Sequence, residues 1–452
     1  MSEVLSHRTE ALLRRLVRRD ASTALNKVVA RSRPEDVAAA MEHLTLAEMR
    51  RLHGMIADRQ LAADVLAHLS DASRDELARE LPTDVLRDLV DRMEPDDATD
   101  VIGGLDQDRR DELLEELEDD PTGEEVRELL TWPADSAGGL MAPNAFMVPH
   151  DATCSDAIAA LMARHERIES IYYVYVVDAA RRLIGVTSLR SLLTTPPMTR
   201  VSDVMSRQVI TVGPRTDQEE VARYVARYDL FAIPVVDEGR RILGVVTVDD
   251  VVDVIREEAA EDMMRMAGVP DGAVDRVGVA TQARNRSKWL FAALASGVLA
   301  AELISFYETS IARAAILAGF IPMVMGVGGN VGIQTATLTV RGLATGAVDA
   351  SNAGRFVTRE VAIACLLGVG FASLLGMYAG LRFGDASAVG VVVALSIAVA
   401  VTLAGAVGAM IPLGFARAGV DPAIATGPFV TSSLDLLGIV VFFNVARALL
   451  GP

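Results

Sequence analysis

Cysteine and histidine are scarce in this 452-residue chain, and that scarcity excludes two kinds of site. The two cysteines, Cys154 and Cys365, are too few and too far apart for a disulfide framework or a thiolate metal site. No two histidines have the spacing of a zinc site, and we interpret all of them as ordinary surface or core residues. They are His7, His43, His53, His68, His150 and His165.

Catalytic motifs and a cleavable leader are also missing. No nucleophile–base pair, HExxH, Walker or GxSxG motif stands out, and we therefore expect that the protein is not an enzyme. The first residues, MSEVLSHRTEALLRRLVRRD, lack the apolar segment of a signal peptide. We expect the N-terminal half to remain in the cytoplasm.

Positive charge is deficient in residues 1–280, which hold 54 acidic and 33 basic residues, a net charge of −21. Residues 281–452 hold only 7 acidic and 10 basic residues and are mostly apolar. The acidic half could not neutralise phosphates, which excludes nucleic acid as a partner. Its charge favours cations as ligands, or it serves solubility alone.

Residues from about 35 to 130 carry short helical patterns that recur every 12 residues. Each step is an apolar anchor followed by a polar residue or proline that suits a helix start. The anchors are Leu69, Leu81, Met93, Leu105 and Leu117. Helices this short cannot each bury a face alone, so we expect them to stack. The pattern predicts an all-α superhelical N-terminal domain over 1–134.

Two copies of another pattern follow at a constant offset of 59 residues. YVYVVDAARRLIGVTSLRSLL and FAIPVVDEGRRILGVVTVDDVV each predict strand, turn, strand and helix, and a helical stretch precedes each copy. This βαββα duplication resembles the tandem CBS module and predicts an α/β pair over 135–257. An acidic stretch, predicted as a linking helix over 258–283, then leads toward the basic ARNRSK.

Five apolar runs predict a membrane domain over 284–452 with five spanning helices. The runs are Trp289–Tyr307, Ala314–Val340, Val361–Leu381, Ala386–Ala416 and Pro422–Ala446. With the N-terminal half inside, seven basic residues lie on the inner side and three, Arg313, Arg382 and Arg447, on the outer side. This asymmetry favours a cytoplasmic N-terminus and an outer C-terminus.

Asp435 is the only charged residue in the last apolar run. An acid at the centre of a spanning helix costs about 2.5–3.5 kcal/mol on insertion scales, so something must offset it. On a helix it shares one face with Pro428, Thr431 and Gly438, and no basic residue in the five runs could pair with it. Asp435 is either a structural carboxylate bonded to a neighbouring helix or, beside a dimer axis, one of two carboxylates that hold a divalent cation.

The second run contains GVGGNVGIQTATLTVRG, which places four glycines within seven residues. Glycine packing between helices and a broken helix that exposes its carbonyl groups both fit this composition. Polar residues in the same run favour a wet path lined by carbonyl groups. They are Asn330, Gln334, Thr335 and Thr337.

Carboxylates in the acidic half recur at short helical spacings, which destabilises a helix unless something compensates. A solvated acidic face and loose oxygen pairs for Mg²⁺, which keeps several of its waters, are the two interpretations. The acids concerned are Asp64, Asp96, Asp100, Asp217, Glu219, Asp229, Asp250, Asp253, Glu258, Glu261 and Asp262.

The order of these segments, with several motifs, resembles the MgtE-type magnesium channels and transporters over essentially the whole chain. The motifs are DSAGGLMAPN at 135–144, TDQEEVARY at 216–224, PVVDEGRRILGVVTVDDVVDV at 234–254, GVGGNVGIQTATLTVRGLATG at 326–346 and GVDPAIATGPFVTSSLDLLG at 419–438. The resemblance implies a homodimer with its pore between the protomers and Asp435 at a hydrated Mg²⁺ site.

The resemblance also implies regulatory Mg²⁺ that bridges the helical domain, the CBS pair and the linking helix. The acids above would bind it, joined by Asp421 at the inner mouth and by main-chain oxygens near Gly139 and Ala226. Some members bind ATP in the CBS pair, near the positions of Tyr173 and Arg190.

We therefore expect a Mg²⁺-selective channel or transporter in the cell membrane that mediates uptake and is gated by cytoplasmic Mg²⁺. Two alternatives remain open on the residues alone. One is a transporter of another divalent cation such as Co²⁺ or Mn²⁺. The other is a nucleotide-responsive membrane receptor without conductance, in which Asp435 is structural.

Overall fold

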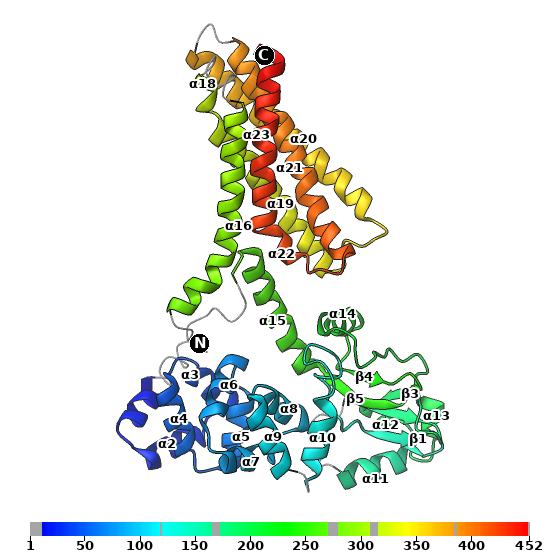
Figure 1. Cartoon of the computed structure of the whole chain (residues 1–452). Coiled ribbons are helices and arrows are strands. Elements are labelled where there is room, and N and C mark those ends of the chain that lie inside the picture. The colour runs from blue at the N-terminus through cyan, green and yellow to red at the C-terminus, as the bar shows by residue number, and fades with distance from the viewer. Residues whose placement is uncertain are drawn as a thin grey trace. The chain divides into compact units, whose positions relative to one another are not determined.

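The computed structural model describes residues 11–117, 120–164, 172–269, 279–307, 315–383 and 387–450. It divides into two compact units, Met1–Arg256 and Glu257–Pro452 (Figure 1). Predictions that involve His7, His165, Arg313 or residues 270–278 of the linking segment lie outside the described residues. The four domain boundaries stay predictions.

Short helices build the first half of the first unit, as the 12-residue pattern predicts. They are α2 (Ser22–Val29), α3 (Pro34–Met41), α4 (Leu46–Met55), α5 (Arg59–Ala67), α6 (Asp71–Glu80), α7 (Thr83–Val90), α8 (Pro95–Gly103), α9 (Gln107–Glu116) and α10 (Pro121–Leu129). The five predicted anchors precede or end these helices and are at most 9% exposed. They join one core that runs through the stack, which explains how helices of two or three turns are stable.

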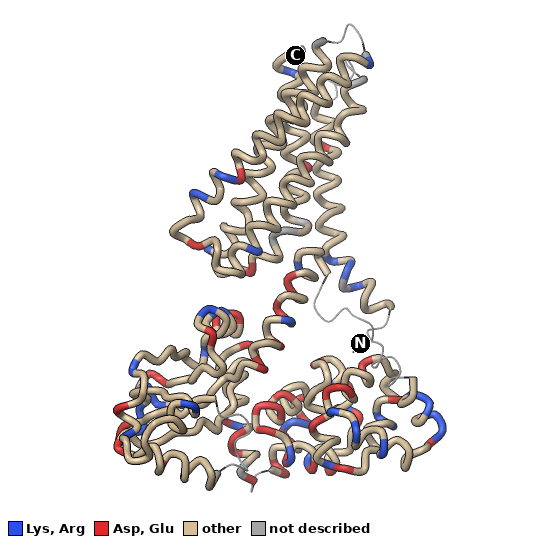
Figure 2. The backbone as a smooth tube through the Cα atoms, turned by 180° about the vertical axis from the view of Figure 1, so that it is seen from behind, with Lys and Arg blue, Asp and Glu red and all other residues tan. Residues whose placement is uncertain are grey.

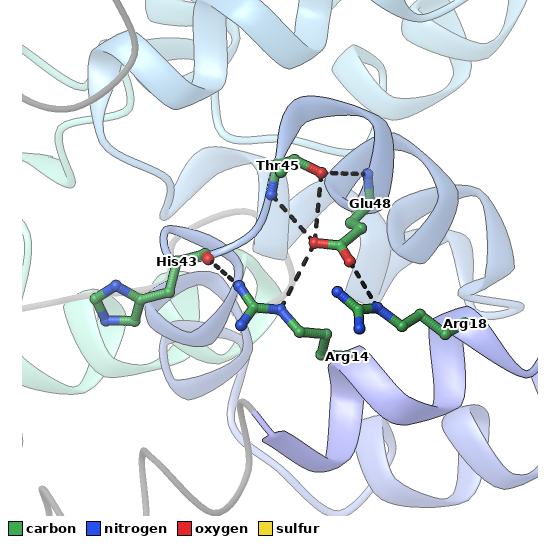
Figure 3. Close-up of polar contacts among 5 residues, drawn as sticks. All are labelled: Arg14, Arg18, His43, Thr45 and Glu48. Atoms are coloured by element: carbon green, nitrogen blue, oxygen red, sulfur yellow. Dashed lines mark hydrogen bonds and ion pairs between the residues drawn. The ribbon is translucent and has the colours of Figure 1, made fainter.

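A capping box fixes the start of α4 (Figure 3). The Glu48 backbone N–H donates to Thr45 Oγ1 at 3.4 Å, and the Glu48 carboxylate accepts from the Thr45 backbone. Arg18, from the helical segment 11–18, donates to the same carboxylate at 3.1 Å, and Arg14 donates to the His43 carbonyl at 2.6 Å. The first described helix is thereby joined to α4.

The second half of the first unit contains two α/β repeats. The first holds β1 (Met147–Pro149), α11 (Cys154–Arg164), β2 (Tyr173–Val177), β3 (Leu183–Ser188) and α12 (Leu189–Thr194), and α13 (Val201–Val204) follows. The second holds α14 (Gln218–Tyr228), β4 (Ala232–Val236) and β5 (Ile242–Thr247). The bulge after Val176 recurs after Val235, and positive φ at Arg181 recurs at Arg240. Both pairs are 59 residues apart, so the duplication is also structural.

Helix α15 (Val248–Met266) differs from the predicted linking helix. It begins directly after β5, ten residues before the predicted start at 258. Residues 279–283, predicted as the end of the same helix, already belong to α16 (Val279–Phe306). The acidic and basic ends of the predicted segment are therefore parts of two different helices.

The second unit is all-α. After α16 come α18 (Ala315–Ala318), α19 (Ile321–Ala344), α20 (Ala353–Phe383), α21 (Ser387–Arg417), α22 (Ala423–Thr426) and α23 (Pro428–Leu450). Among the described residues, α16, α20, α21 and α23 are long and apolar enough to cross a membrane. Helix α19 has 24 residues, which corresponds to a length of ~36 Å. Figure 2 shows that charged residues are sparse along these helices and numerous in the first unit.

The expected break at the glycine-rich motif is wrong. Residues 321–344 form one uninterrupted helix that includes all four glycines. Its main-chain carbonyl groups are therefore engaged in helical hydrogen bonds, apart from the last turn, and are not released by a break in the helix. Gly332 instead allows close packing of α19 against its neighbouring helices.

Candidate metal-binding carboxylates and ion pathway

Helices α19, α21 and α23 approach one another closely beside Asp435. A Cβ atom at Gly408 would lie 2.4 Å from the Gly332 carbonyl oxygen, so α19 and α21 are nearly in backbone contact there. A Cβ atom at Gly332 would lie 2.0 Å from Leu434 Cδ1, which places α23 against the same glycine. Leu434 itself is buried. The glycines therefore fix the wall from which the neighbouring Asp435 extends.

Asp435 is half-buried on α23 and carries the isolated carboxylate of that helix. The ion pairs formed within the described part of the chain do not include it. The nearby Thr431 hydroxyl donates to the Gly427 carbonyl of its own helix turn at 3.0 Å. A partly open carboxylate without a basic partner among the described residues is suited to a cation that comes from outside the chain.

Three carboxylates from two distant helices lie close together in the first unit. Asp96 and Asp97 belong to the first turn of α8, and Asp250 belongs to the first turn of α15. Burial raises the pKa of Asp96 to about 7, of Asp97 to about 6 and of Asp250 to about 7. Repulsion between Asp96 and Asp250, and between Asp250 and Asp97, acts in the same direction. We call these three residues the α8–α15 carboxylate cluster.

The cluster is only partly satisfied by hydrogen bonds. Thr247 Oγ1 donates to Asp250 Oδ2 at 2.6 Å, and the Thr247 N–H donates to the same oxygen at 3.3 Å. Asp96 Oδ1 is buried and has no hydrogen-bond partner within the described ranges. Buried carboxylates normally have a partner, and an unpartnered one indicates a missing proton, water or cation.

Asp100, which sequence spacing pairs with Asp96, forms an ion pair with Arg74. Arg74 Nη1 lies 3.3 Å from Asp100 Oδ2, and Arg74 Nη2 lies 2.9 Å from Asp71 Oδ1. Burial raises the pKa of Asp100, and the Arg74 charge opposes that shift. Asp64 lies on α5 and accepts from its own helix neighbour Gln60 at 2.9 Å.

The segment around Gly139 positions α8 relative to α15. Its backbone pairs with the second α/β repeat, where Ala137 N–H donates to Thr216 O at 2.7 Å and Ala142 and Val245 exchange two hydrogen bonds of 2.9 Å. A Cβ atom at Gly139 would lie 2.4 Å from the Pro133 carbonyl oxygen. Only glycine fits there, and the helical stack is thereby joined to the repeat from which α15 begins.

The remaining acids predicted in the first unit have local roles. Asp217 caps α14 by accepting from the Glu219 N–H at 2.9 Å, and Asp229 ends that helix in the left-handed conformation with φ 51°. Ala226 is exposed on α14. Asp253 pairs with Arg256 one turn away at 3.3 Å. Within the described residues, no group of three or more His, Cys, Asp or Glu is arranged to hold a metal ion.

A second group of charges lies within the second unit, where the end of α15 meets the segment before α22. Burial raises the pKa of Asp262 to about 6, with Asp421 and then Glu258 as additional causes. Arg265 forms ion pairs with Glu261 and with Asp421. A Cβ atom at Gly427 would lie 2.9 Å from the Met266 carbonyl oxygen, which places the end of α15 against the start of α23. The helix that carries Asp435 thus begins at this contact.

The predicted nucleotide residues lie in the first α/β repeat. The Tyr173 hydroxyl accepts from the Phe231 N–H at 3.5 Å and so joins the two repeats. Tyr172 and Phe231 stack with ring centroids 5.4 Å apart. Arg190 is exposed on α12. The role of Tyr173 and Arg190 as ligands stays a prediction.

Comparison with known proteins assigns the chain to a family. The model of a divalent cation transporter family, MgtE, matches residues 321–445, the MgtE intracellular N domain model matches 32–135, and the CBS domain model matches 137–196 and 201–257. The chain is 35% identical to the magnesium transporter MgtE of Thermus thermophilus over 432 residues, 94% of this chain and 95% of that protein. The chain belongs to the MgtE family.

Other members and solved structures agree with this assignment. The magnesium transporter MgtE of Enterococcus faecalis is 36% identical over 71% of this chain and 71% of its own length. The crystal structure of the cytosolic domain of the Mg²⁺ channel MgtE in complex with ATP is 36% identical, with a TM-score of 0.50 over 54% of this chain and 99% of that one. The soluble part of a magnesium transporter is 28% identical, with a TM-score of 0.50 over 56% of this chain and 99% of that one.

Three residues at these candidate sites in this MgtE member were missed by reasoning from the sequence. Asp97 belongs to the α8–α15 carboxylate cluster, and its position directly after Asp96 was the only signal. Arg74 and Arg265 neutralise predicted metal ligands. Both are basic, so the recurring pattern of acidic residues does not indicate them.

Proposed function

We propose that this MgtE family member is a Mg²⁺-selective channel that carries Mg²⁺ into the cell between two protomers. The observation that carries the proposal is the half-buried Asp435 of α23, which has no basic partner among the described residues. Two such carboxylates beside a dimer axis would repel each other unless a divalent ion lay between them. The close relatives that are named magnesium transporters support Mg²⁺ as that ion.

The proposed membrane domain has five spanning helices, with α19 as the fifth beside the four longer apolar helices. With the first unit in the cytoplasm, the last helix places the C-terminus outside. The membrane potential then favours entry of a divalent ion by about 4.6 kcal/mol per 100 mV. No step of the proposed transport makes or breaks a covalent bond.

Cytoplasmic Mg²⁺ is proposed to favour the closed state by binding to two sets of acids. In the α8–α15 carboxylate cluster, negatively charged groups lie close together where two parts of the first unit meet. Asp262 and Asp421 lie close together where α15 meets the segment before α23. Bound Mg²⁺ would neutralise both sets. Without it, repulsion favours separation, and the change is a shift between two states through differential binding.

ATP is a further proposed ligand of the CBS pair, near Tyr173 and Arg190. The proposal is supported by the related cytosolic domain that was crystallised with ATP. It does not extend to a role of ATP in transport.

Flux into sealed liposomes that contain only this protein tests the proposal. An inside-negative potential should drive Mg²⁺ uptake above that of protein-free liposomes, and Co²⁺, Mn²⁺ and Ca²⁺ should compete weakly. Preferred uptake of one of those ions would assign the protein to another divalent cation. Absence of any divalent flux, with the protein inserted and folded, would support the receptor without conductance.

The regulatory part has its own test in the same liposomes. Asp250→Asn combined with Asp253→Asn should weaken the block of uptake by Mg²⁺ on the side of the first unit. An unchanged block would remove these acids from the sensor while leaving the pore proposal intact.

A further inference from the structure

Three cations lie within five residues at the start of α16: Arg284, Arg286 and Lys288. All three are exposed. Over the ranges that the structure describes, none of them forms an ion pair, and Arg286 makes only a 3.5 Å hydrogen bond to Gln282. Unpaired cations at the end of a spanning helix have an unmet preference for anions.

Trp289 sets the depth of these cations. Its ring meets Phe429 of α23 edge-on with centroids 6.1 Å apart, and Phe429 meets Phe415 of α21 in the same way at 5.7 Å. Tryptophan prefers the level of the lipid headgroups, and this cluster fixes it to three helices. With a rise of 1.5 Å per residue, the three cations lie ~2–8 Å beyond Trp289 along the helix axis, at the level of lipid phosphates.

The apolar surface that continues from Trp289 is uncovered by the chain itself. Leu290, Phe291, Leu294 and Val298 are 67%, 67%, 61% and 57% exposed. None of the most apolar 18 residues of α16 is buried in the chain. The helix therefore has an apolar face that suits lipid acyl chains and a cationic end that suits lipid phosphates.

We propose that the inner end of α16 binds anionic phospholipid, with the headgroup phosphates on Arg284, Arg286 and Lys288 and the acyl chains along the exposed face. Charge complementarity argues for this occupant. A second membrane half would not supply the missing anions, because residues 281–452 carry a net charge of +3. Arg417, exposed two residues after Phe415, adds a fourth cation on α21 near the same aromatic cluster.

Trp289 provides a direct probe, because the chain has only two tryptophans. The full-length Trp132→Tyr variant, with Trp289 as its single tryptophan, is reconstituted in mixtures of phosphatidylglycerol and phosphatidylcholine. In matched samples, one lipid or the other carries brominated acyl chains, which quench tryptophan on contact. The quenching should report an enrichment of phosphatidylglycerol beside Trp289 of at least about fivefold, which is the contribution of a single cation near an anionic surface.

Arg284→Gln combined with Arg286→Gln and Lys288→Gln should lower the enrichment to less than about twofold, and salt should weaken it in the parent. The matched control is Arg355→Gln with Arg359→Gln, two exposed cations at the start of α20, which should leave it unchanged. Retention of phosphatidylglycerol by the full-length protein in native mass spectrometry gives an independent readout. Equal quenching by the two lipids, or an enrichment that survives in the triple variant, overturns the proposal and assigns the cations to another partner, such as the acidic surface of the chain.

Discussion

Neutralising Asp250 should stabilise the first unit when Mg²⁺ is absent. The half-buried carboxylate lies beside Asp96 and Asp97, and its partial burial raises its pKa from 3.8 to about 7. A shift of that size corresponds to about 4 kcal/mol of free energy that the charged form costs above pH 7. In Asp250→Asn the amide oxygen can still accept from Thr247, and the weaker hydrogen bond loses about 1 kcal/mol. The net gain in unfolding free energy is therefore ~2–3 kcal/mol.

The assay is thermal unfolding of the full-length protein in detergent with a chelator. The measured quantity is the midpoint temperature at which the first unit unfolds. The variant should unfold ~5–10 °C above the parent, and added Mg²⁺ should stabilise it less than it stabilises the parent. Asp253→Asn, on the same helix but exposed and paired with Arg256, is the matched control and should shift the midpoint little.

The same reasoning gives a pH dependence with a definite sign. The folded-state pKa of Asp250 is above its unfolded value, so its contribution favours the folded state below pH ~4 and is lost as the pH rises to about 7. The parent in chelator should lose stability over that window relative to Asp250→Asn. A variant that is less stable than the parent at pH 8, or a difference that does not grow with pH, would refute the account of the cluster.

Three further variants test other contacts. Gly408→Ala should lower the unfolding free energy by ~1–3 kcal/mol, because its Cβ would lie 2.4 Å from the Gly332 carbonyl oxygen. Gly329→Ala, with open space around it, is the control and should be tolerated. Equal effects of the two variants in thermal unfolding would contradict the packing. Arg265→Gln removes the cation that neutralises Asp421. The freed carboxylate attracts Mg²⁺ more strongly, so the cytoplasmic Mg²⁺ concentration that blocks flux should fall. Exposed Arg256→Gln is the control, and a raised blocking concentration is the contrary result. Burial lowers the pKa of His53. Below pH ~6.5 the parent should therefore lose stability relative to His53→Leu in denaturant titrations. The same pH dependence of stability in the parent and in His53→Leu would show that His53 is not buried in solution.

The repeats of the first unit could be predicted because residues close together in the sequence determine them. Leu81 and Leu105 mark helix ends at a fixed spacing, and each is buried as a shared anchor. The two α/β repeats match even in the positive φ of Arg181 and Arg240. Such features depend on residues within one or two turns, which sequence spacing records directly.

The contacts between distant segments could not be predicted in the same way. Asp97 lies on α8 and Asp250 on α15, and the segment around Gly139 pairs with the second repeat between them in the chain. Spacing along one helix gives no information about that contact. Glycines at Gly332 and Gly408 fit both a broken helix and close packing, and only the neighbouring helix decides between them. The ion pair of Arg265 joins residues 156 positions apart.

The most direct test of the central claim is Mg²⁺ flux through Asp435→Asn in sealed liposomes, with Glu302→Gln, which removes the acid of α16, as the control. The account predicts that Asp435→Asn lowers the flux by on the order of 100-fold, since two lost carboxylates remove a few kcal/mol of attraction for a divalent ion, and that Glu302→Gln leaves it nearly unchanged. Intact flux and intact preference for Mg²⁺ in a folded Asp435→Asn protein would contradict the claim.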